Sequence, residues 1–238
     1  MNFDDLFQAH TEYSNRVDGV MVAIVTNNED PEKLARVKLK LPILDGEHET
    51  DWARIATFMA GKDRGSLFIP EVGDVVLVAF HMGDIREPFV IGMLWNTDQP
   101  SPEAGKDNNI RKIKSREGHE IIFGDDAADG KITIKTKKGQ IVELMDKTDI
   151  IKIAEKSGNN SIEIKGGSAN EITIKSSTSK ITMNAKGDIS IESSKAIKIK
   201  STQVQIEASA QLSLKAGAAL DIKSDGMITI KGSLVKIN

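Results

Sequence analysis

The sequence has no cysteine, and its aromatic residues and prolines are confined to its N-terminal part. All ten aromatic residues lie at or before Phe123, and all six prolines lie at or before Pro102. Without cysteine, disulfide bonds cannot hold the fold together. Without aromatic side chains, the last 115 residues cannot fill a wide hydrophobic interior. The C-terminal part is therefore expected to have a slender core.

Long hydrophobic runs are also missing. No apolar run approaches the roughly 18 residues that a membrane span needs. The first residues, MNFDDLFQAH, are acidic rather than basic and then apolar, as a signal peptide would be. We therefore expect a chain that is made in the cytoplasm.

Charge divides the chain into two parts. Residues 1–130 carry 14 Lys and Arg against 24 Asp and Glu, whereas residues 131–238 carry 18 Lys, no Arg and 11 acidic residues. The acidic N-terminal part lacks the basic groove that nucleic-acid binding requires, so we expect no nucleic-acid partner.

The C-terminal part repeats one short pattern, in which two apolar residues flank a polar one and a few small, polar or lysine residues follow. Such alternation puts both apolar side chains on one face of a strand. Successive pairs begin 9 to 11 residues apart up to residue 181 and 7 or 8 residues apart beyond it. A strand that buries two side chains cannot offset the entropy of ordering the whole repeat, so the repeats must stack. The pairs are Ile132/Ile134, Ile141/Val142 with Leu144, Ile151/Ile153, Ile162/Ile164, Ile172/Ile174, Ile181/Met183, Ile189/Ile191, Ile197/Ile199, Val204/Ile206, Leu212/Leu214, Leu220/Ile222, Ile228/Ile230 and Val235/Ile237.

The N-terminal part reads as short strands and turns. Five extended segments are expected at residues 17–27, 34–44, 51–59, 74–82 and 88–96. Five strands in so short a stretch predict a small closed barrel of the oligonucleotide/oligosaccharide-binding (OB) type. A short amphipathic helix is expected at residues 3–12. The aromatic residues Trp52, Phe58, Phe68, Phe80, Phe89 and Trp95 are interpreted as barrel core or trimer contacts.

Residues 51–96 carry a specific set of motifs. These are Trp52-Ala53-Arg54, Gly61-Lys62-Asp63-Arg64-Gly65, Ile69-Pro70-Glu71-Val72-Gly73-Asp74-Val75-Val76-Leu77-Val78, Gly83-Asp84 and Pro88-Phe89-Val90-Ile91-Gly92. Together they resemble the phage baseplate assembly protein V / valine-glycine repeat protein G family, the central spikes of contractile tails, tailocins and type VI-like injection systems. In this setting Gly61, Gly65, Gly73 and Gly83 are expected at turns, and Pro70 is expected to start a strand.

The resemblance implies an all-β homotrimer. An N-terminal arm (1–16) would precede an OB-fold barrel (17–96). A linker and first shaft layer (97–130), with Ile121, Ile122 and Phe123 buried, would lead into an intertwined triple-stranded β-helix shaft (131–238). The composition agrees, because three chains close the sheet edges that one chain would leave open.

The function that the resemblance implies is structural: a membrane-puncturing central spike without catalytic or cofactor-binding residues. A baseplate hub protein would bind at the N-terminal end, where Asp4, Asp5 and Glu12 are candidates. A PAAR-type tip protein would bind at the C-terminal end, with Leu234, Val235, Ile237 and Asn238 as candidates. The short segment before the barrel resembles the stand-alone phage or tailocin arrangement. The spike would be assembled into a particle, be extracellular on release and contact the target envelope transiently.

Two further groups of residues allow more than one interpretation. Glu117, Glu120, Asp125 and Asp126 could suggest acid/base chemistry but are better interpreted as a solvated linker. Lys135, Lys165, Lys175, Lys200, Lys215, Lys223 and Lys231 follow the apolar pairs and could favour anionic lipid, although a solvated face is the simpler interpretation.

Other functions remain open or are disfavoured. The isolated histidines His10, His48, His81 and His119 lack the His-x-His pattern of some phage tips, so no metal site is expected. An OB-fold binding module or a trimeric adhesin with a β-solenoid stalk remains the alternative function. A polysaccharide-degrading tailspike is disfavoured because the shaft has no aromatic residues to stack on sugars.

Overall fold

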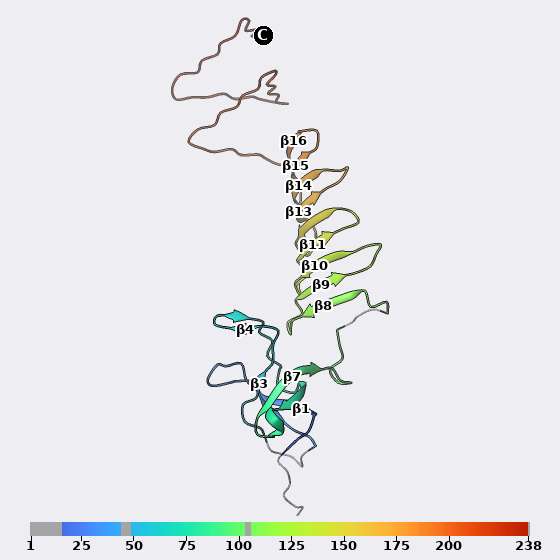
Figure 1. The fold of residues 1–238 in the computed structure, drawn as a ribbon. Helices are drawn as coiled ribbons and strands as arrows, with labels where there is room; N and C mark the ends of the chain where they lie inside the picture. Colours follow the sequence, from blue (N-terminus) through green and yellow to red (C-terminus); the bar gives the residue numbers. More distant parts are fainter. Residues whose placement is uncertain (1–15, 44–48, 103–105, 238) are drawn as a thin grey trace, which may run out of the picture.

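The computed structural model describes residues 16–43, 49–102 and 106–237. These residues form a small barrel, a long antiparallel sheet that rises from it, and a C-terminal segment that winds away beyond the sheet (Figure 1). The helix expected at residues 3–12 lies outside the described residues. Among those described, no helix is long and apolar enough to cross a membrane.

The barrel is built on a five-stranded sheet with the order β2-β1-β6-β7-β3. Each of the five extended segments predicted from the sequence contains one of its strands. The pairs are antiparallel except for β3 and β7, which run parallel. The strands are β1 (Val20–Asn27), β2 (Lys38–Lys40), β3 (Arg54–Ile55), β6 (Val75–Phe80) and β7 (Pro88–Leu94), with the short 3-10 turn η2 (His81–Gly83) between the last two.

Aliphatic side chains fill the barrel, and most of the aromatic residues do not. Of the six aromatic residues interpreted as core or trimer contacts, Phe80 is buried, whereas Phe58, Phe68 and Trp95 are exposed and Trp52 and Phe89 are half-buried. A barrel this small is filled by branched side chains from alternating positions, so the core interpretation was wrong for the exposed three. The core consists of Ala23, Val25, Val37, Leu39, Leu41, Ala53, Val76, Val78, Phe80 and Val90.

A hairpin that the sequence analysis missed projects from the barrel between β3 and β6. We call residues 56–69 the projecting hairpin. Its short strands are β4 (Ala60–Gly61) and β5 (Arg64–Gly65), joined through Lys62 and Asp63. The Thr57 hydroxyl donates to the Ser66 carbonyl at 2.6 Å, and the Ser66 amide donates to the Met59 carbonyl at 3.0 Å. These bonds close the base of the hairpin, so its shape is defined within one chain.

Two expectations about motif residues need correction. Pro70 is buried but does not start a strand, because β6 begins only at Val75. Its carbonyl instead accepts a hydrogen bond from the Asn28 side chain at 3.0 Å. Gly61 and Gly65 lie in the two strands of the projecting hairpin rather than in its turn. Gly73 and Gly83 have positive φ, as the turn interpretation required.

The shaft is a nine-stranded sheet in which every strand pairs antiparallel with the next along the chain. The first two strands lie within residues 97–130, the segment interpreted as a linker and first shaft layer. The other seven hold the first seven predicted apolar pairs. The strands are β8 (Ile110–Lys114), β9 (Glu120–Gly124), β10 (Lys131–Lys135), β11 (Ile141–Met145), β12 (Ile150–Ala154), β13 (Asn160–Lys165), β14 (Glu171–Ser176), β15 (Ser179–Asn184) and β16 (Ile189–Ser193).

The chain changes character after β16. Residues 194–237 contain no strand, and every side chain in residues 195–237 is exposed. Within the described residues 195–237, no backbone–backbone hydrogen bond is formed. The last six apolar pairs predicted as strands therefore have no strand partner inside this chain.

Candidate functional site

The shaft presents one continuous apolar face. The strand register places the apolar residues directly opposite one another from strand to strand, in two columns. One column begins at Ile113 and Ile121, and the other begins at Arg111 and Phe123. We call the following set the apolar face: Ile113, Ile121, Phe123, Ile132, Ile134, Val142, Leu144, Ile151, Ile153, Ile162, Ile164, Ile172, Ile174, Ile181, Met183, Ile189 and Ile191.

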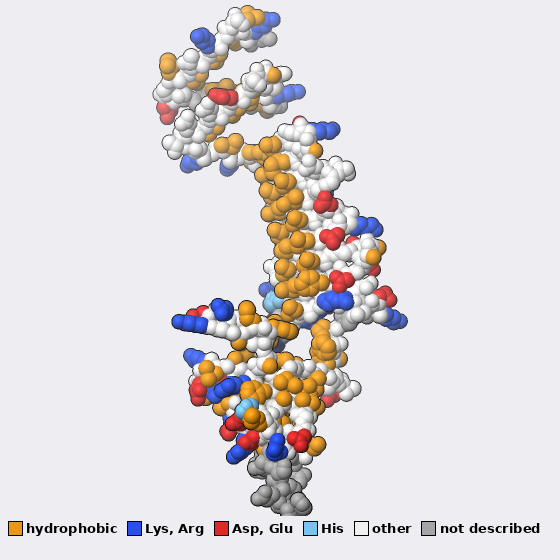
Figure 2. Space-filling view, viewed as in Figure 1, with side chains coloured by type: hydrophobic (Ala, Val, Ile, Leu, Met, Phe, Trp, Pro, Cys, Tyr) orange, Lys and Arg blue, Asp and Glu red, His pale blue; other side chains and the backbone are white. Residues whose placement is uncertain are grey.

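This face is uncovered in the single chain. Figure 2 shows it as an orange column along one side of the shaft. Its large side chains from Ile113 to Ile191 are mostly 36% to 69% exposed. Soluble monomers rarely expose a contiguous apolar patch of more than a few hundred Å². A patch of this kind is typical of a surface that contacts another protein, a membrane or a ligand. Of the residues expected to be buried in the first shaft layer, Ile121 and Phe123 belong to this face and are exposed in the single chain, whereas Ile122 is half-buried on the opposite face.

The opposite face of the sheet carries ion pairs instead. Glu120 lies 3.2 Å from Lys114 and 3.8 Å from Lys112, and the hydrogen bond from Lys114 is the main reason that its carboxyl pKa is lowered. Higher up, Lys165 lies 3.1 Å from Glu163 and 3.4 Å from Glu171, and the bond to Glu163 raises the pKa of its ammonium group. A polar face paired in this way suits contact with water, which leaves the apolar face for the partner.

In the segment beyond β16, the apolar side chains are exposed, and the backbone of residues 195–237 forms no backbone–backbone hydrogen bond with any described residue. Its apolar pairs from Ile197/Ile199 to Val235/Ile237 are all exposed. A row of unpaired N–H and C=O groups is a template for pairing with another chain. Residues 195–237 thus continue the exposed apolar side chains of the shaft and add unpaired backbone groups to them.

The structure places only some of the predicted end residues. Leu234, Val235 and Ile237 are exposed at the end of the described segment. Asn238 and the hub candidates Asp4, Asp5 and Glu12 lie outside the described residues.

The four carboxylates once weighed for acid/base chemistry each have a local bonding role. Asp125 pairs with Arg111 at 2.9 Å, and Glu117 pairs with Lys137 at 3.5 Å. Asp126 accepts a hydrogen bond from the Ala128 amide at 2.7 Å, and Glu120 is held by the two lysines described above. They lie in strands and turns of the shaft rather than in a linker. Their bonds support the structural interpretation.

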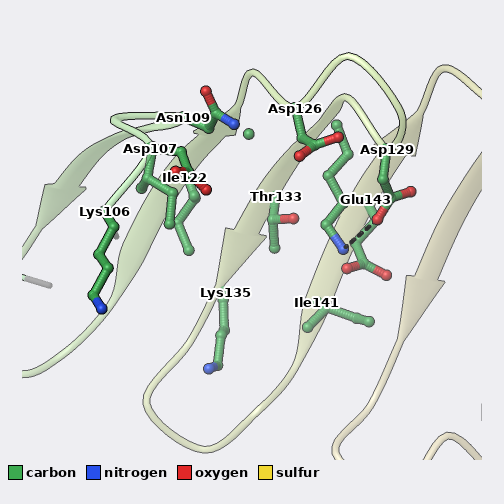
Figure 3. Close-up of a pocket in the computed structure, with 13 residues that line it drawn as sticks. Lys106, Asp107, Asn109, Ile122, Asp126, Asp129, Thr133, Lys135, Ile141 and Glu143 are labelled. Atoms are coloured by element: carbon green, nitrogen blue, oxygen red, sulfur yellow. Dashed lines mark ion pairs between the residues drawn. The ribbon is translucent and has the colours of Figure 1, made fainter. Parts of the chain in front are cut away.

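An open groove of about 740 Å³ lies at the base of the shaft (Figure 3). Acidic and basic side chains line it together, and Asp129 lies 4.0 Å from Lys131. The lysines that line the groove neutralise part of the negative charge of Asp126, Asp129 and Glu143. These carboxylates are therefore poorly suited to bind a cation. In the part of the chain that the structure describes, no group of three or more His, Asp or Glu residues could hold a metal ion.

The projecting hairpin is the surface that sequence reasoning missed. It exposes Phe58, Met59, Leu67 and Phe68, although the hydrogen bonds of Thr57 and Ser66 close its base. The signal was present in the motif Gly61-Lys62-Asp63-Arg64-Gly65, where a polar turn between glycines separates two apolar stretches.

Comparison with known proteins now adds to this geometry. Residues 21–95 match the model of the type VI secretion system/phage-baseplate injector OB domain. The type VI secretion system spike protein VgrG3 of Vibrio cholerae is 30% identical over 137 residues, which cover 52% of this chain and 14% of that protein. The type VI secretion system spike protein VgrG2a of Pseudomonas aeruginosa is 34% identical over 111 residues, which cover 43% of this chain and 13% of that protein.

A third relative carries a different description. The actin cross-linking toxin VgrG1 of Vibrio cholerae is 26% identical over 146 residues, which cover 56% of this chain and 13% of that protein. The chain thus spans only a small part of the length of each of these relatives.

Proposed function

We propose that this chain, whose residues 21–95 belong to the type VI secretion system/phage-baseplate injector OB-domain family, is the membrane-puncturing central spike of a contractile injection apparatus. The observation that carries the proposal is the uncovered apolar face, together with the unpaired segment that continues it. Both are features of a shaft that is completed by other chains.

The proposed assembly is a homotrimer. Three sheets that turn their apolar faces inward enclose a narrow triangular core, which two columns of Ile, Val, Leu and Met can fill without aromatic side chains. Phe123 is the exception, and it lies at the base. Three chains also leave the ion-paired faces outside. Burying each Ile side chain contributes about 1.5–3 kcal/mol relative to exposure, so the full face would hold the trimer firmly.

Repeat spacing supports a change of chain path after β16. Repeats of 9 to 11 residues hold a strand and a hairpin turn, so that the chain can return beside itself. The eight-residue repeat from Ile181 to Ile189 is the shortest that still forms a hairpin, and every repeat after it has only 7 or 8 residues. The segment 194–237 would instead pass onward around the axis, and strands of the other two copies would lie between its successive strands. This arrangement is the intertwined triple-stranded β-helix.

The proposed work of the shaft is mechanical and needs no active site. When a sheath contracts, force must pass through a narrow, stiff body to breach an envelope. Strands hydrogen-bonded along the whole shaft provide that stiffness. A baseplate hub would lie at the barrel end, contacted by Asp4, Asp5 and Glu12. A PAAR-type tip protein would contact Leu234, Val235, Ile237 and Asn238 at the other end. Of these tip candidates, the first three are exposed and apolar. The assembled particle, a phage tail or tailocin, would be extracellular on release.

Light scattering on the full chain tests the central step. A trimer would have three times the 25.9 kDa mass of one chain. A stable monomer would contradict the spike and would favour the alternative, an OB-fold binding module with a single-chain stalk.

A further inference from the structure

The projecting hairpin exposes an apolar surface that its own chain does not use. Phe58 is 99% exposed, and Met59, Leu67 and Phe68 are also exposed. The hydrogen bonds that Thr57 and Ser66 form at its base show that this exposure belongs to a shaped hairpin. Side chains of this kind on a defined hairpin indicate a contact with another protein surface.

The hairpin also forms one wall of an apolar groove. The groove has a volume of about 370 Å³ and lies between the hairpin and the barrel. Leu34 and Ile55 line its barrel side, and Met59, Leu67 and Phe68 line its hairpin side. One or two large apolar side chains of a partner fit such a space.

The position of the hairpin indicates which partner reaches it. It leaves the barrel at the level of β8, at the base of the shaft (Figure 1). It projects on the side of the molecule where the apolar column of the shaft lies (Figure 2). If other copies of the chain cover the apolar face, those copies must also surround the hairpin.

The hairpin turn and the turn after β9 at the base of the shaft also carry charged residues. At the hairpin turn, Lys62 and Arg64 form no ion pair with any described residue. At the base of the shaft, β9 runs from Ile121 and Phe123 into a turn that contains Asp125, Asp126 and Asp129. Asp125 and Asp129 already lie 2.9 Å from Arg111 and 4.0 Å from Lys131, whereas Asp126 forms no ion pair with any described residue. Both surfaces run from apolar to charged, and Asp126 is the carboxylate left for Lys62 and Arg64.

We propose that the projecting hairpin of each chain packs against the base of the shaft of a second copy. The hairpin completes the core at the base of the shaft, where its apolar side chains and the groove behind them receive Ile121 and Phe123 of that copy, and Lys62 and Arg64 approach the acidic turn after β9. The inference rests on the proposed trimer and adds a contact that fastens each barrel to the neighbouring shaft.

Cross-linking between introduced cysteines tests this contact, because the natural chain has no cysteine. The test protein is the full chain with Phe58→Cys and Ile121→Cys. The matched controls are the full chain with Phe58→Cys alone and with Ile121→Cys alone, because one cysteine per chain lets a bismaleimide join at most two copies, even where the same position of two copies meets in the core. Each protein is treated with a short bismaleimide and analysed by denaturing gel, and its native mass is measured by light scattering.

The expected result is a ladder that reaches covalent trimers for the first protein, no covalent trimer for either control, and only background dimer for Phe58→Cys alone. A native trimer that gives no covalent trimer in the double variant, or that already gives strong dimer with Phe58→Cys alone, would overturn the hairpin contact and leave the trimer intact. A native monomer would overturn the trimer and the contact together. Cross-linking confined within one chain leaves the gel band at the monomer position and also contradicts the proposal.

Discussion

At the scale of single residues, the projecting hairpin depends on one glycine. Gly65 has a φ of +152°, and a Cβ at this position would lie 2.5 Å from the Met59 carbonyl oxygen. That oxygen accepts the hydrogen bond that closes the hairpin base. The close approach of two backbone segments therefore requires glycine here.

Gly65→Ala should open the hairpin while leaving the barrel folded. A side chain forced into such a conformation costs on the order of 1–3 kcal/mol, so the Ser66 amide should exchange faster with solvent. Hydrogen exchange with and without the substitution measures this. Gly92→Ala is the control, because no atom lies within 4 Å of its would-be Cβ. Unchanged exchange at Ser66 in the Gly65 variant would refute the role assigned to this glycine.

A second residue-scale feature is the carboxylate of Glu155, in the turn between β12 and β13. Hydrogen bonds from the Ser157 hydroxyl and amide and from the amides of Asn159 and Asn160 lower its pKa to about 2. A lowered carboxyl pKa stabilises the folded turn above the unfolded pKa, and this stabilisation is lost as the pH falls toward 2.

Ser157→Ala should raise the pKa of Glu155 toward its ordinary value, because the hydroxyl is the largest cause of the shift. The acid-induced loss of turn stability should then be complete at a pH closer to 4.5, the ordinary pKa of glutamate. Carboxyl titration followed by NMR measures the pKa, and exchange of the Asn160 amide follows the turn. An unchanged midpoint in the variant would show that the hydroxyl does not hold the carboxylate.

At the scale of elements, two neighbouring residues of β15 point to opposite faces of the shaft. Ile181 lies opposite Ile174 and Ile191 on the apolar face, whereas Thr182 lies opposite Thr173 and Ser190 on the polar face. The two residues lie in the same strand and at the same level of the shaft, but one is on the apolar face and the other on the polar face.

Ile181→Glu should therefore weaken the proposed trimer, and Thr182→Glu should not. The first change removes about 2 kcal/mol of apolar burial from each chain and adds the cost of desolvating a carboxylate. Light scattering over a dilution series compares the concentrations at which the two variants dissociate. Equal dissociation would mean that the apolar face is not the contact surface.

The element scale also shows how far local patterns predict this fold. Alternating apolar residues predicted the strands β10 to β16 because the period of two sets the face of each side chain without reference to the rest of the molecule. Residue type alone did not place the aromatic residues, which were interpreted as barrel core or trimer contacts. Phe58 and Trp95 are exposed, because residues such as Leu39 and Val76 fill the small interior of the barrel.

At the scale of the whole molecule, the shaft contains two regions that both repeat apolar pairs but differ in backbone pairing. Up to β16 the strands of the shaft form backbone hydrogen bonds with one another, whereas residues 195–237 form no backbone–backbone hydrogen bond with any described residue. Their hydrogen bonds must come from other chains if they form strands at all.

The amides of residues 197–237 should accordingly be protected from hydrogen exchange in the native assembly. Ile181→Glu provides the control, since dissociation should expose the same amides and raise their exchange by orders of magnitude. Mass-spectrometric exchange on the full chain measures both. Rapid exchange in the native assembly would exclude the intertwined β-helix, even if the mass is that of a trimer.

The sequence alone determined the all-β character, the strands of the barrel, the apolar pairs of the shaft and the family resemblance, which the OB-domain match and the spike relatives confirm. These features depend on residue types a few positions apart. Only the tertiary structure revealed the projecting hairpin, the exposure of Phe58 and the point after β16 where pairing within the chain ends. Those features depend on the space left by distant segments and on whether the chain can return beside itself, which no local pattern contains.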